Sequence, residues 1–277
     1  MIKFRNILSG TAVALTLMVG ATQASADLVT EWDYTIESGF SDFGPAGAIP
    51  GGVEASVPNP GIGGLPTTLS WGIGDTGPSQ LMVTPTISGG PGGLFTNGAA
   101  VAGASLTHQN RIIGPGATLE TATLASTLLL TPIAPAPGTP FGPVPIFFNI
   151  LFEETDNFGL DNNGGTDDCT AGTGSQPCAD IFVLANDPAL SFDFILDGIV
   201  YTVELLIDGI GPLSDEACAF AGAASGCIGF LTIEEQENVL TTAFSITARA
   251  VPEPGTLALL GLGLLGLGVA RRRKVAA

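Results

Sequence analysis

Apolar side chains recur at every second residue along much of this chain. Trp32, Tyr34 and Ile36 alternate with polar neighbours, and the same spacing returns several times further along. Successive side chains of a β-strand point to opposite faces of a sheet, so a period of two is typical of a strand that is buried on one face. We predict about eight to ten strands, among them the segments 69–73, 119–130, 146–152, 190–196, 201–207 and 244–248.

The stretches between these strands are rich in residues that favour turns. The chain has 39 Gly and 20 Pro, and Asp197-Gly198 is typical of a tight β-hairpin. Residues 44–64 and 132–145 are predicted to be long loops, and a short helix is expected only around 232–239. This pattern predicts an all-β fold, an antiparallel β-sandwich or jelly-roll-like single domain over residues 27–250.

The N-terminal segment has the three regions of a secretory signal peptide in the correct order. A short basic region precedes the apolar run 7–19, and Ala24-Ser25-Ala26 offers the small residues that a signal peptidase accepts. We therefore expect residues 1–26 to be a signal peptide, cut between Ala26 and Asp27, and the rest of the chain to be exported.

The C-terminal segment combines a chain-breaking motif, an apolar stretch and a basic cluster. Val251, Pro252, Glu253 and Pro254 precede an apolar stretch over 256–270, which is followed by Arg271, Arg272, Arg273 and Lys274. The stretch would span about 22 Å as a helix, somewhat less than the ~30 Å of a bilayer core. We predict one transmembrane helix over 256–270, with the basic tail 271–274 on the cytoplasmic side.

This arrangement, over residues 251–277, resembles the PEP-CTERM sorting signal of Gram-negative bacteria. The resemblance implies that an exosortase, a membrane-embedded cysteine transpeptidase, cuts the chain near Pro252-Glu253-Pro254. It also implies transient anchoring in the inner membrane, followed by a cell-surface or extracellular location, in bacteria that make exopolysaccharide and form biofilms or flocs. A single-span anchor that is never processed is the alternative.

The region between the two targeting segments is strongly acidic. Residues 27–250 contain 25 Asp and Glu but only two basic residues, Arg111 and Arg249, and no Lys. Such a charge favours cations and solubility outside the cell, and it repels the phosphate backbone of nucleic acids. We therefore expect no nucleic-acid partner.

Four cysteines form two pairs with identical spacing, Cys169 with Cys178 and Cys218 with Cys227. In an exported protein, an even number of cysteines most simply indicates disulfides. Four cysteines allow three pairings, and the spacing favours the two short-range bridges, each worth roughly 2–3 kcal/mol through loop entropy. A zinc site built from all four thiolates is the alternative, although paired zinc ligands usually lie closer in sequence.

An acidic loop over 153–168 invites a calcium hypothesis. Asp161, Asn163 and Asp167 offer oxygen ligands at alternating positions, as Ca²⁺ prefers. The EF-hand pattern fails, because Gly165 stands at the fifth position and no Glu stands at the twelfth. We interpret the loop as a solvated turn beside the first cysteine pair, with calcium at Asp161, Asn163 and Asp167 as the alternative.

The sequence holds no complete catalytic motif. Asp75-Thr76-Gly77 copies the tripeptide of aspartic proteases, but no second copy supplies the partner carboxylate, so we interpret it as a turn. His108 is the single histidine, and no Gly-x-Ser-x-Gly motif supplies a nucleophile for it. A hydrolase would have to use two carboxylates at a suitable separation.

Residues 107–110 spell Thr-His-x-Asn, and the surrounding chain resembles the THxN family of PEP-CTERM proteins. The resemblance covers most of the body from about Trp32 onward and includes the segments 148–155, 178–184, 227–230 and 251–254. It implies kinship and trafficking but no particular activity. Thr107, His108 and Asn110 are expected to form a hydrogen-bonded structure near the end of a strand that begins about Val101.

Together these features predict a non-enzymatic exported surface or extracellular-matrix protein. The expected partners are signal peptidase, an exosortase and, before processing, the inner membrane, with exopolysaccharide as a candidate; the only candidate cofactor is calcium. One alternative is a calcium-dependent carbohydrate-binding module. Its candidate sugar-stacking residues occupy strand positions that also predict burial: Trp32, Tyr34, Trp71 and Tyr201. The second alternative is an extracellular hydrolase.

Overall fold

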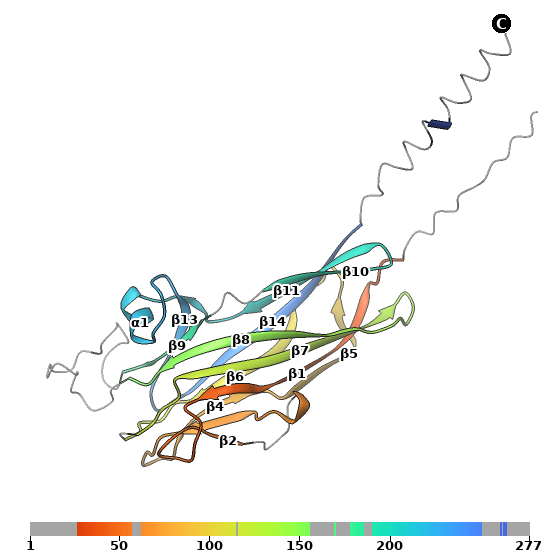
Figure 1. Ribbon diagram of the computed structural model, residues 1–277. Helices are drawn as coiled ribbons and strands as arrows, with labels where there is room; N and C mark the ends of the chain where they lie inside the picture. Colours follow the sequence, from red (N-terminus) through yellow and green to blue (C-terminus); the bar gives the residue numbers. More distant parts are fainter. Residues whose placement is uncertain are drawn as a thin grey trace, which may run out of the picture.

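The computed structural model describes residues 27–56, 62–114, 116–155, 169, 178–185, 190–250, 261 and 263–264. Two antiparallel sheets of seven strands each pack face to face, as Figure 1 shows. The first sheet has the order β12 (Gly211–Pro212), β13 (Ile228–Thr232), β9 (Asp180–Leu184), β8 (Phe141–Glu153), β7 (Thr121–Ala134), β1 (Glu31–Gly44) and β5 (Thr86–Phe95). The second has the order β10 (Ser191–Leu196), β11 (Ile199–Ile207), β14 (Glu237–Ala250), β6 (Val101–Gln109), β4 (Ser79–Val83), β3 (Thr68–Trp71) and β2 (Glu54–Ser56).

The alternation in the sequence decides which side chains fill the space between the sheets. Trp32 and Tyr34 of β1 are buried and meet aromatic rings of the second sheet edge to face. The centroid of Trp32 lies 5.1 Å from that of Tyr201, and the centroid of Tyr34 lies 4.9 Å from that of Phe244. The antiparallel β-sandwich predicted from the sequence is therefore confirmed.

The Asp197-Gly198 hairpin is also confirmed. β10 and β11 pair up to Leu196 and Ile199, and the two residues between them have φ angles of 49° and 74°. Asp and Gly tolerate this left-handed backbone better than most residues, which is why their dipeptide marks a tight hairpin.

Two of the predicted connections differ from the structure. The segment 232–239 is not a helix, because β13 ends at Thr232, the chain turns, and β14 begins at Glu237. The predicted loop 132–145 is largely strand, since β7 extends to Ala134 and β8 begins at Phe141. The α-helix of the described body lies elsewhere, as α1 (Asp215–Phe220), and the loop before β3 includes a short 3-10 helix, η1 (Ile62–Gly64).

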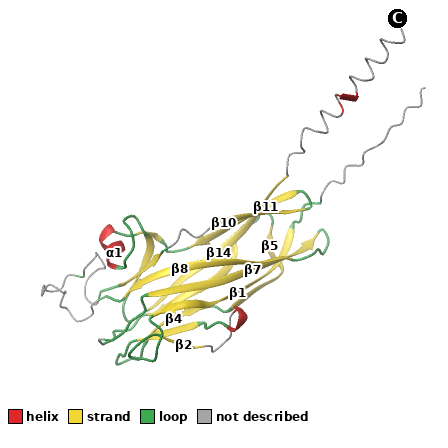
Figure 2. Cartoon of the chain, viewed as in Figure 1, coloured by secondary structure: helices red, strands yellow, loops and turns green. Residues whose placement is uncertain are grey.

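Both short-range disulfides are formed. Cys169 bonds Cys178 just before β9, and Cys218 of α1 bonds Cys227 just before β13. A zinc site that uses all four thiolates is therefore wrong. The Cys218–Cys227 bridge holds α1 against the edge of the first sheet, at the left of Figure 2.

The four aromatic residues considered for sugar stacking all lie in the core. Trp32, Trp71 and Tyr201 are fully buried, and Tyr34 is 6% exposed. These side chains fill the space between the sheets and offer no ring face to a ligand at the surface, so they are not a sugar-binding platform.

The two targeting segments lie almost entirely outside the described residues. These include the signal peptide 1–26, the motif 251–254 and the basic tail 271–274, whereas three residues of 256–270 are described. Within the part of the chain that the structure describes, no helix has the length and hydrophobicity needed to cross a membrane.

Candidate metal centre

Buried polar residues gather at one end of the sandwich, where inward-facing strand positions change from apolar to polar. On each strand the change follows the period of two that defines the buried face. Each apolar residue is followed by polar ones at these inward positions: Leu106 by His108 and Asn110 at the end of β6, Phe152 by Glu154 at the end of β8, Phe182 by Asp180 toward the start of β9, and Phe230 by Thr232 and Glu234 at the end of β13.

Three carboxylates from these strands lie together. Ligand oxygens of Glu154, Asp180 and Glu234 all lie within 4.8 Å of one another. Asp180 is fully buried and Glu234 is 3% exposed. Glu154 is half-buried as a residue, but its Oε1 atom is buried and has no hydrogen-bond partner within the described residues. Two ionised carboxylates this close repel by at least about 3 kcal/mol at an effective dielectric constant of 20.

Glu154 is held by the indole of Trp71. The Nε1–H of Trp71 donates to Oε2 of Glu154 at 3.0 Å. Burial raises the pKa of Glu154 to about 8; the Trp71 hydrogen bond opposes this rise, while the neighbouring carboxylates of Glu234 and Glu153 add to it. The environment therefore strongly disfavours the ionised form of Glu154 when no cation is bound.

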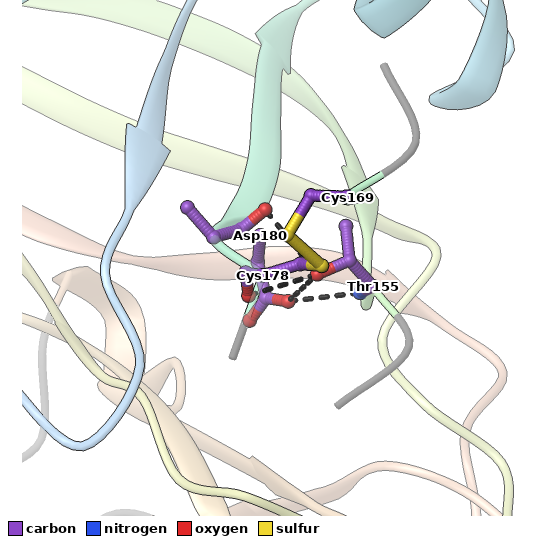
Figure 3. Close-up of a disulfide and its surroundings, with 5 residues drawn as sticks. Thr155, Cys169, Cys178 and Asp180 are labelled. Carbon is purple, nitrogen blue, oxygen red and sulfur yellow. Dashed lines mark hydrogen bonds between the residues drawn. A yellow bond between two sulfur atoms is a disulfide. The ribbon is translucent and has the colours of Figure 1, made fainter. Parts of the chain in front are cut away.

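Asp180 is fixed by Thr155 and by the nearby Cys169–Cys178 disulfide. Figure 3 shows these side chains side by side, at the start of β9. The backbone N–H of Thr155 donates to Asp180 Oδ1 at 2.9 Å, and its hydroxyl donates to the carbonyl of Cys178 at 2.9 Å. Asp180 Oδ2 is buried, and no described residue forms a hydrogen bond with it. Burial, with Glu154 and Glu234, raises the pKa of Asp180 well above its usual value against the two Thr155 hydrogen bonds.

His108 lies among aromatic rings beside the carboxylates. Its ring stacks on Trp71 with centroids 5.4 Å apart, and its Nδ1 atom is 2.9 Å from the hydroxyl of Thr232. Thr232 and Asp180 are directly paired residues of β13 and β9. Burial lowers the pKa of His108 to about 3, so its imidazole is neutral at physiological pH and supplies no counter-charge.

Asn110 lies at the same end of the sandwich and bonds the chain on both sides of Glu234. Its Nδ2 donates to the carbonyl of Thr232 at 3.1 Å, and its backbone N–H donates to the carbonyl of Gln236 at 3.0 Å. The residue therefore spans the turn that carries Glu234. Thr107 is half-buried and faces the other side of β6 by strand alternation. The expected hydrogen-bonded structure at the end of this strand is present for His108 and Asn110.

The described body has very few basic side chains that could neutralise the three carboxylates. Residues 27–250 contain only Arg111 and Arg249 as basic residues, and Arg249 forms a salt bridge of 2.8 Å with exposed Asp193 on β10. A bound cation would supply counter-charge to Glu154 and Asp180, whose buried Oε1 and Oδ2 atoms have no hydrogen-bond partner among the described residues. Carboxylate and amide oxygens are the ligands that hard divalent cations prefer.

The sequence analysis did not identify this cluster as a candidate site. Its calcium candidates Asp161, Asn163 and Asp167 lie outside the described residues. The sequence pattern does indicate two members of the cluster. Glu154 follows Phe152 by two residues and Asp180 precedes Phe182 by two residues, so the period of two predicts that both carboxylates face the core. An inward-facing carboxylate at the end of an apolar strand face requires a partner in the folded state.

An open cleft lies next to the cluster but does not reach it. The cleft, about 480 Å³ in volume, is lined by exposed or half-buried residues that include Asp75, Thr76, Ile112 and Glu235. Asp75 belongs to a turn closed by a hydrogen bond of 3.1 Å from Gly77 N–H to the Gly74 carbonyl, as expected. Neither His108 nor the three clustered carboxylates line this cleft.

Comparison with protein families matches the C-terminal segment of the chain. Residues 250–274 match the PEP-CTERM protein-sorting motif, and this segment contains Pro252-Glu253-Pro254 and the basic residues 271–274. No curated protein matches the chain. The motif indicates a PEP-CTERM protein that is exported and processed by an exosortase. The match begins at Ala250, the last residue of β14.

Proposed function

We propose that this chain is a non-enzymatic surface protein of a Gram-negative bacterium, sorted by an exosortase and delivered to the extracellular polymer layer. The sorting motif over residues 250–274 is the single observation that carries the proposal. The signal peptide 1–26 would direct export, and the helix 256–270 with its basic tail would hold the chain in the inner membrane until processing. The resemblance of the Thr-His-x-Asn motif and its flanking segments to the THxN family supports membership of that family as part of the proposal.

The position of the motif fits a cut that spares the folded body. β14 is paired on both sides, with β11 and with β6, and its pairing extends to Ala250. A cut near Pro252 would leave every paired residue of both sheets in the product. The released protein would therefore keep its fold.

Burial supports the non-enzymatic part of the proposal. Catalytic groups must contact a substrate, whereas His108 is 1% exposed and Asp180 is fully buried. The cleft beside the cluster contains carboxylates but no histidine, cysteine or lysine. We therefore propose a structural role for the polar end of the sandwich.

The location of the protein in strains with and without the exosortase tests the proposal. With the enzyme present, we expect the wild-type body at the cell surface or in the medium. A variant with Pro252, Glu253 and Pro254 all changed to Ala should remain in the membrane fraction. Glu204→Ala is the matched control, because it removes one exposed carboxylate without touching the motif. Identical fractionation of the wild type and the motif variant would refute exosortase sorting.

Binding to purified exopolysaccharide tests the matrix part separately. We expect the sorted protein to sediment with polymer isolated from its own host. A protein that is correctly sorted but stays in the supernatant at every polymer concentration would remove exopolysaccharide as a partner while leaving the sorting proposal intact.

A further inference from the structure

We propose that Glu154, Asp180 and Glu234 bind one calcium ion at the end of the sandwich, where it joins β8, β9 and the turn between β13 and β14. The three ligand oxygens already lie within 4.8 Å of one another. Oxygens that share one Ca²⁺ ion are each about 2.3–2.6 Å from it, so they lie at most about 5 Å apart. The cluster therefore has the right size before any ion enters.

Unsatisfied buried atoms support the presence of a ligand here. Glu154 Oε1 and Asp180 Oδ2 are buried and have no hydrogen-bond partner in the part of the chain that the structure describes. Buried polar atoms in native proteins are nearly always paired, so two such oxygens in one cluster indicate a group that completes their coordination.

Asn110 provides an independent observation outside the acidic cluster. Its side chain is fully buried and is fixed by its bond to Thr232, against the turn that carries Glu234. Its amide oxygen Oδ1 has no hydrogen-bond partner among the residues that the structure describes. Calcium sites commonly include an amide oxygen beside carboxylates. We therefore include Asn110 Oδ1 as the fourth protein ligand.

The surroundings favour calcium over magnesium. Mg²⁺ binds in strict octahedral geometry and keeps several water molecules, whereas Ca²⁺ accepts irregular sets of protein oxygens. The cluster lies beside Trp71, which donates to Glu154, and close to Phe152 and Phe182, which pack on His108. Such an apolar environment leaves little room for a hydrated ion. The excess of acidic over basic residues in 27–250 would draw cations toward the body.

Calorimetric titration of the purified full chain, stripped with a chelator, tests the proposal directly. We expect one Ca²⁺ ion per chain and a higher unfolding temperature in CaCl₂ than in chelator. MgCl₂ at the same concentration should raise the unfolding temperature less. No calcium binding, or equal unfolding temperatures with calcium and with chelator, would overturn the proposal.

The variant Glu234→Gln locates the ion. It keeps the shape of the side chain and removes one ligand charge, so calcium affinity should fall by more than about tenfold. In chelator, however, this variant should unfold at a higher temperature than the wild type, because one repelling charge is gone. A protein that merely misfolds would not gain stability in this way.

Two further proteins complete the experiment. Glu235→Gln is the matched control, because Glu235 is adjacent, exposed and changes the net charge equally, and it should keep wild-type calcium affinity. A double variant, Asp161→Asn with Asp167→Asn, should also keep it. Calcium binding that is lost in the double variant but kept in Glu234→Gln would place the ion in the acidic loop and overturn the proposal.

Discussion

Thr232 connects the two sheets at the polar end of the sandwich through two different atoms. Its hydroxyl lies 2.9 Å from His108 Nδ1, and its carbonyl accepts a hydrogen bond from Asn110 Nδ2. All three residues are buried, so water cannot replace either hydrogen bond at low cost. His108 and Asn110 therefore have a structural role that requires no ligand: they attach the end of β6 to the end of β13.

The variant Asn110→Ala tests this role. It leaves the buried carbonyl of Thr232 without its donor, which should lower the free energy of unfolding by about 1–3 kcal/mol. Urea denaturation in the presence of a chelator measures this cost without any contribution from calcium. Gln236→Ala is the control, because its side chain is exposed and its carbonyl still accepts the Asn110 N–H. Equal stability of the two variants would contradict the role assigned to Asn110.

Ionisation of Tyr201 is expected to lower the stability of the fold at alkaline pH. Its hydroxyl oxygen accepts a hydrogen bond of 2.9 Å from Val29 N–H. Burial raises the pKa of this phenol; the Val29 hydrogen bond opposes the rise, and Asp197 adds to it. Because the folded-state pKa is the higher one, this contribution to stability is complete below about pH 10 and is lost as the pH rises through the folded-state pKa.

We therefore expect the urea midpoint of the wild type to fall as the pH rises above about 10. The fall should be shallower in Tyr201→Phe, which has no phenol to ionise at this position. Denaturation curves at a series of pH values measure both slopes. Parallel pH profiles for the two proteins would show that Tyr201 ionisation is not linked to unfolding.

At the scale of elements, strands whose apolar residues alternate with polar ones could be predicted, and strands without that alternation could not. β1 and β11 alternate along their length, so their period is visible in the sequence. β9 is short and buried at four of its five residues, which leaves no alternation to detect. β5 contains four Gly and one Pro, and it forms a strand because it pairs with β1, not because of its own propensity.

The incorrect helix over 232–239 has a similar cause. Residues 234–237 are Glu-Glu-Gln-Glu, which favour a helix by local propensity. In the folded chain Glu235 has a φ angle of 57° within a turn, and β14 then pairs with β6 from Glu237 onward. Pairing between distant strands thus overrides local preference. The same long-range register brings Glu154, Asp180 and Glu234 together, which is why their clustering could not be predicted.

The Cys218–Cys227 disulfide is expected to hold α1 in place. A helix of six residues is far too short to be stable alone, and its first turn is capped by Ser214, which accepts from Ala217 N–H. Changing both cysteines to Ala should lower the free energy of local unfolding around α1 by roughly 2–3 kcal/mol. Because the bridge closes only a local loop, the loss should speed hydrogen exchange at the Ala221 amide and leave the amides of β6 unchanged. Unchanged protection of Ala221 would show that packing alone holds the helix.

At the scale of the whole molecule, β14 connects the carboxylate cluster with the sorting motif. It begins at Glu237, paired with Gln109 beside the buried carboxylates, and ends at Ala250, where the sorting motif begins. Its 14 residues span roughly 43 Å. The candidate calcium site therefore lies at the end of the sandwich far from the sorting segment. We therefore expect a variant in the carboxylate cluster to leave sorting unaffected, and a variant in the sorting motif to leave calcium affinity unaffected.

The intact mass of the mature protein, isolated from an exosortase-containing host, tests the central claim most directly. The claim is that the body 27–250 is exported and then separated from its membrane segment near Pro252. It predicts a chain that begins at Asp27 and ends within residues 250–255, with any acceptor molecule as added mass. In a strain without the exosortase, the mass should extend to Ala277. A mature protein that retains residues beyond Gly255 in the strain with the active enzyme would contradict it.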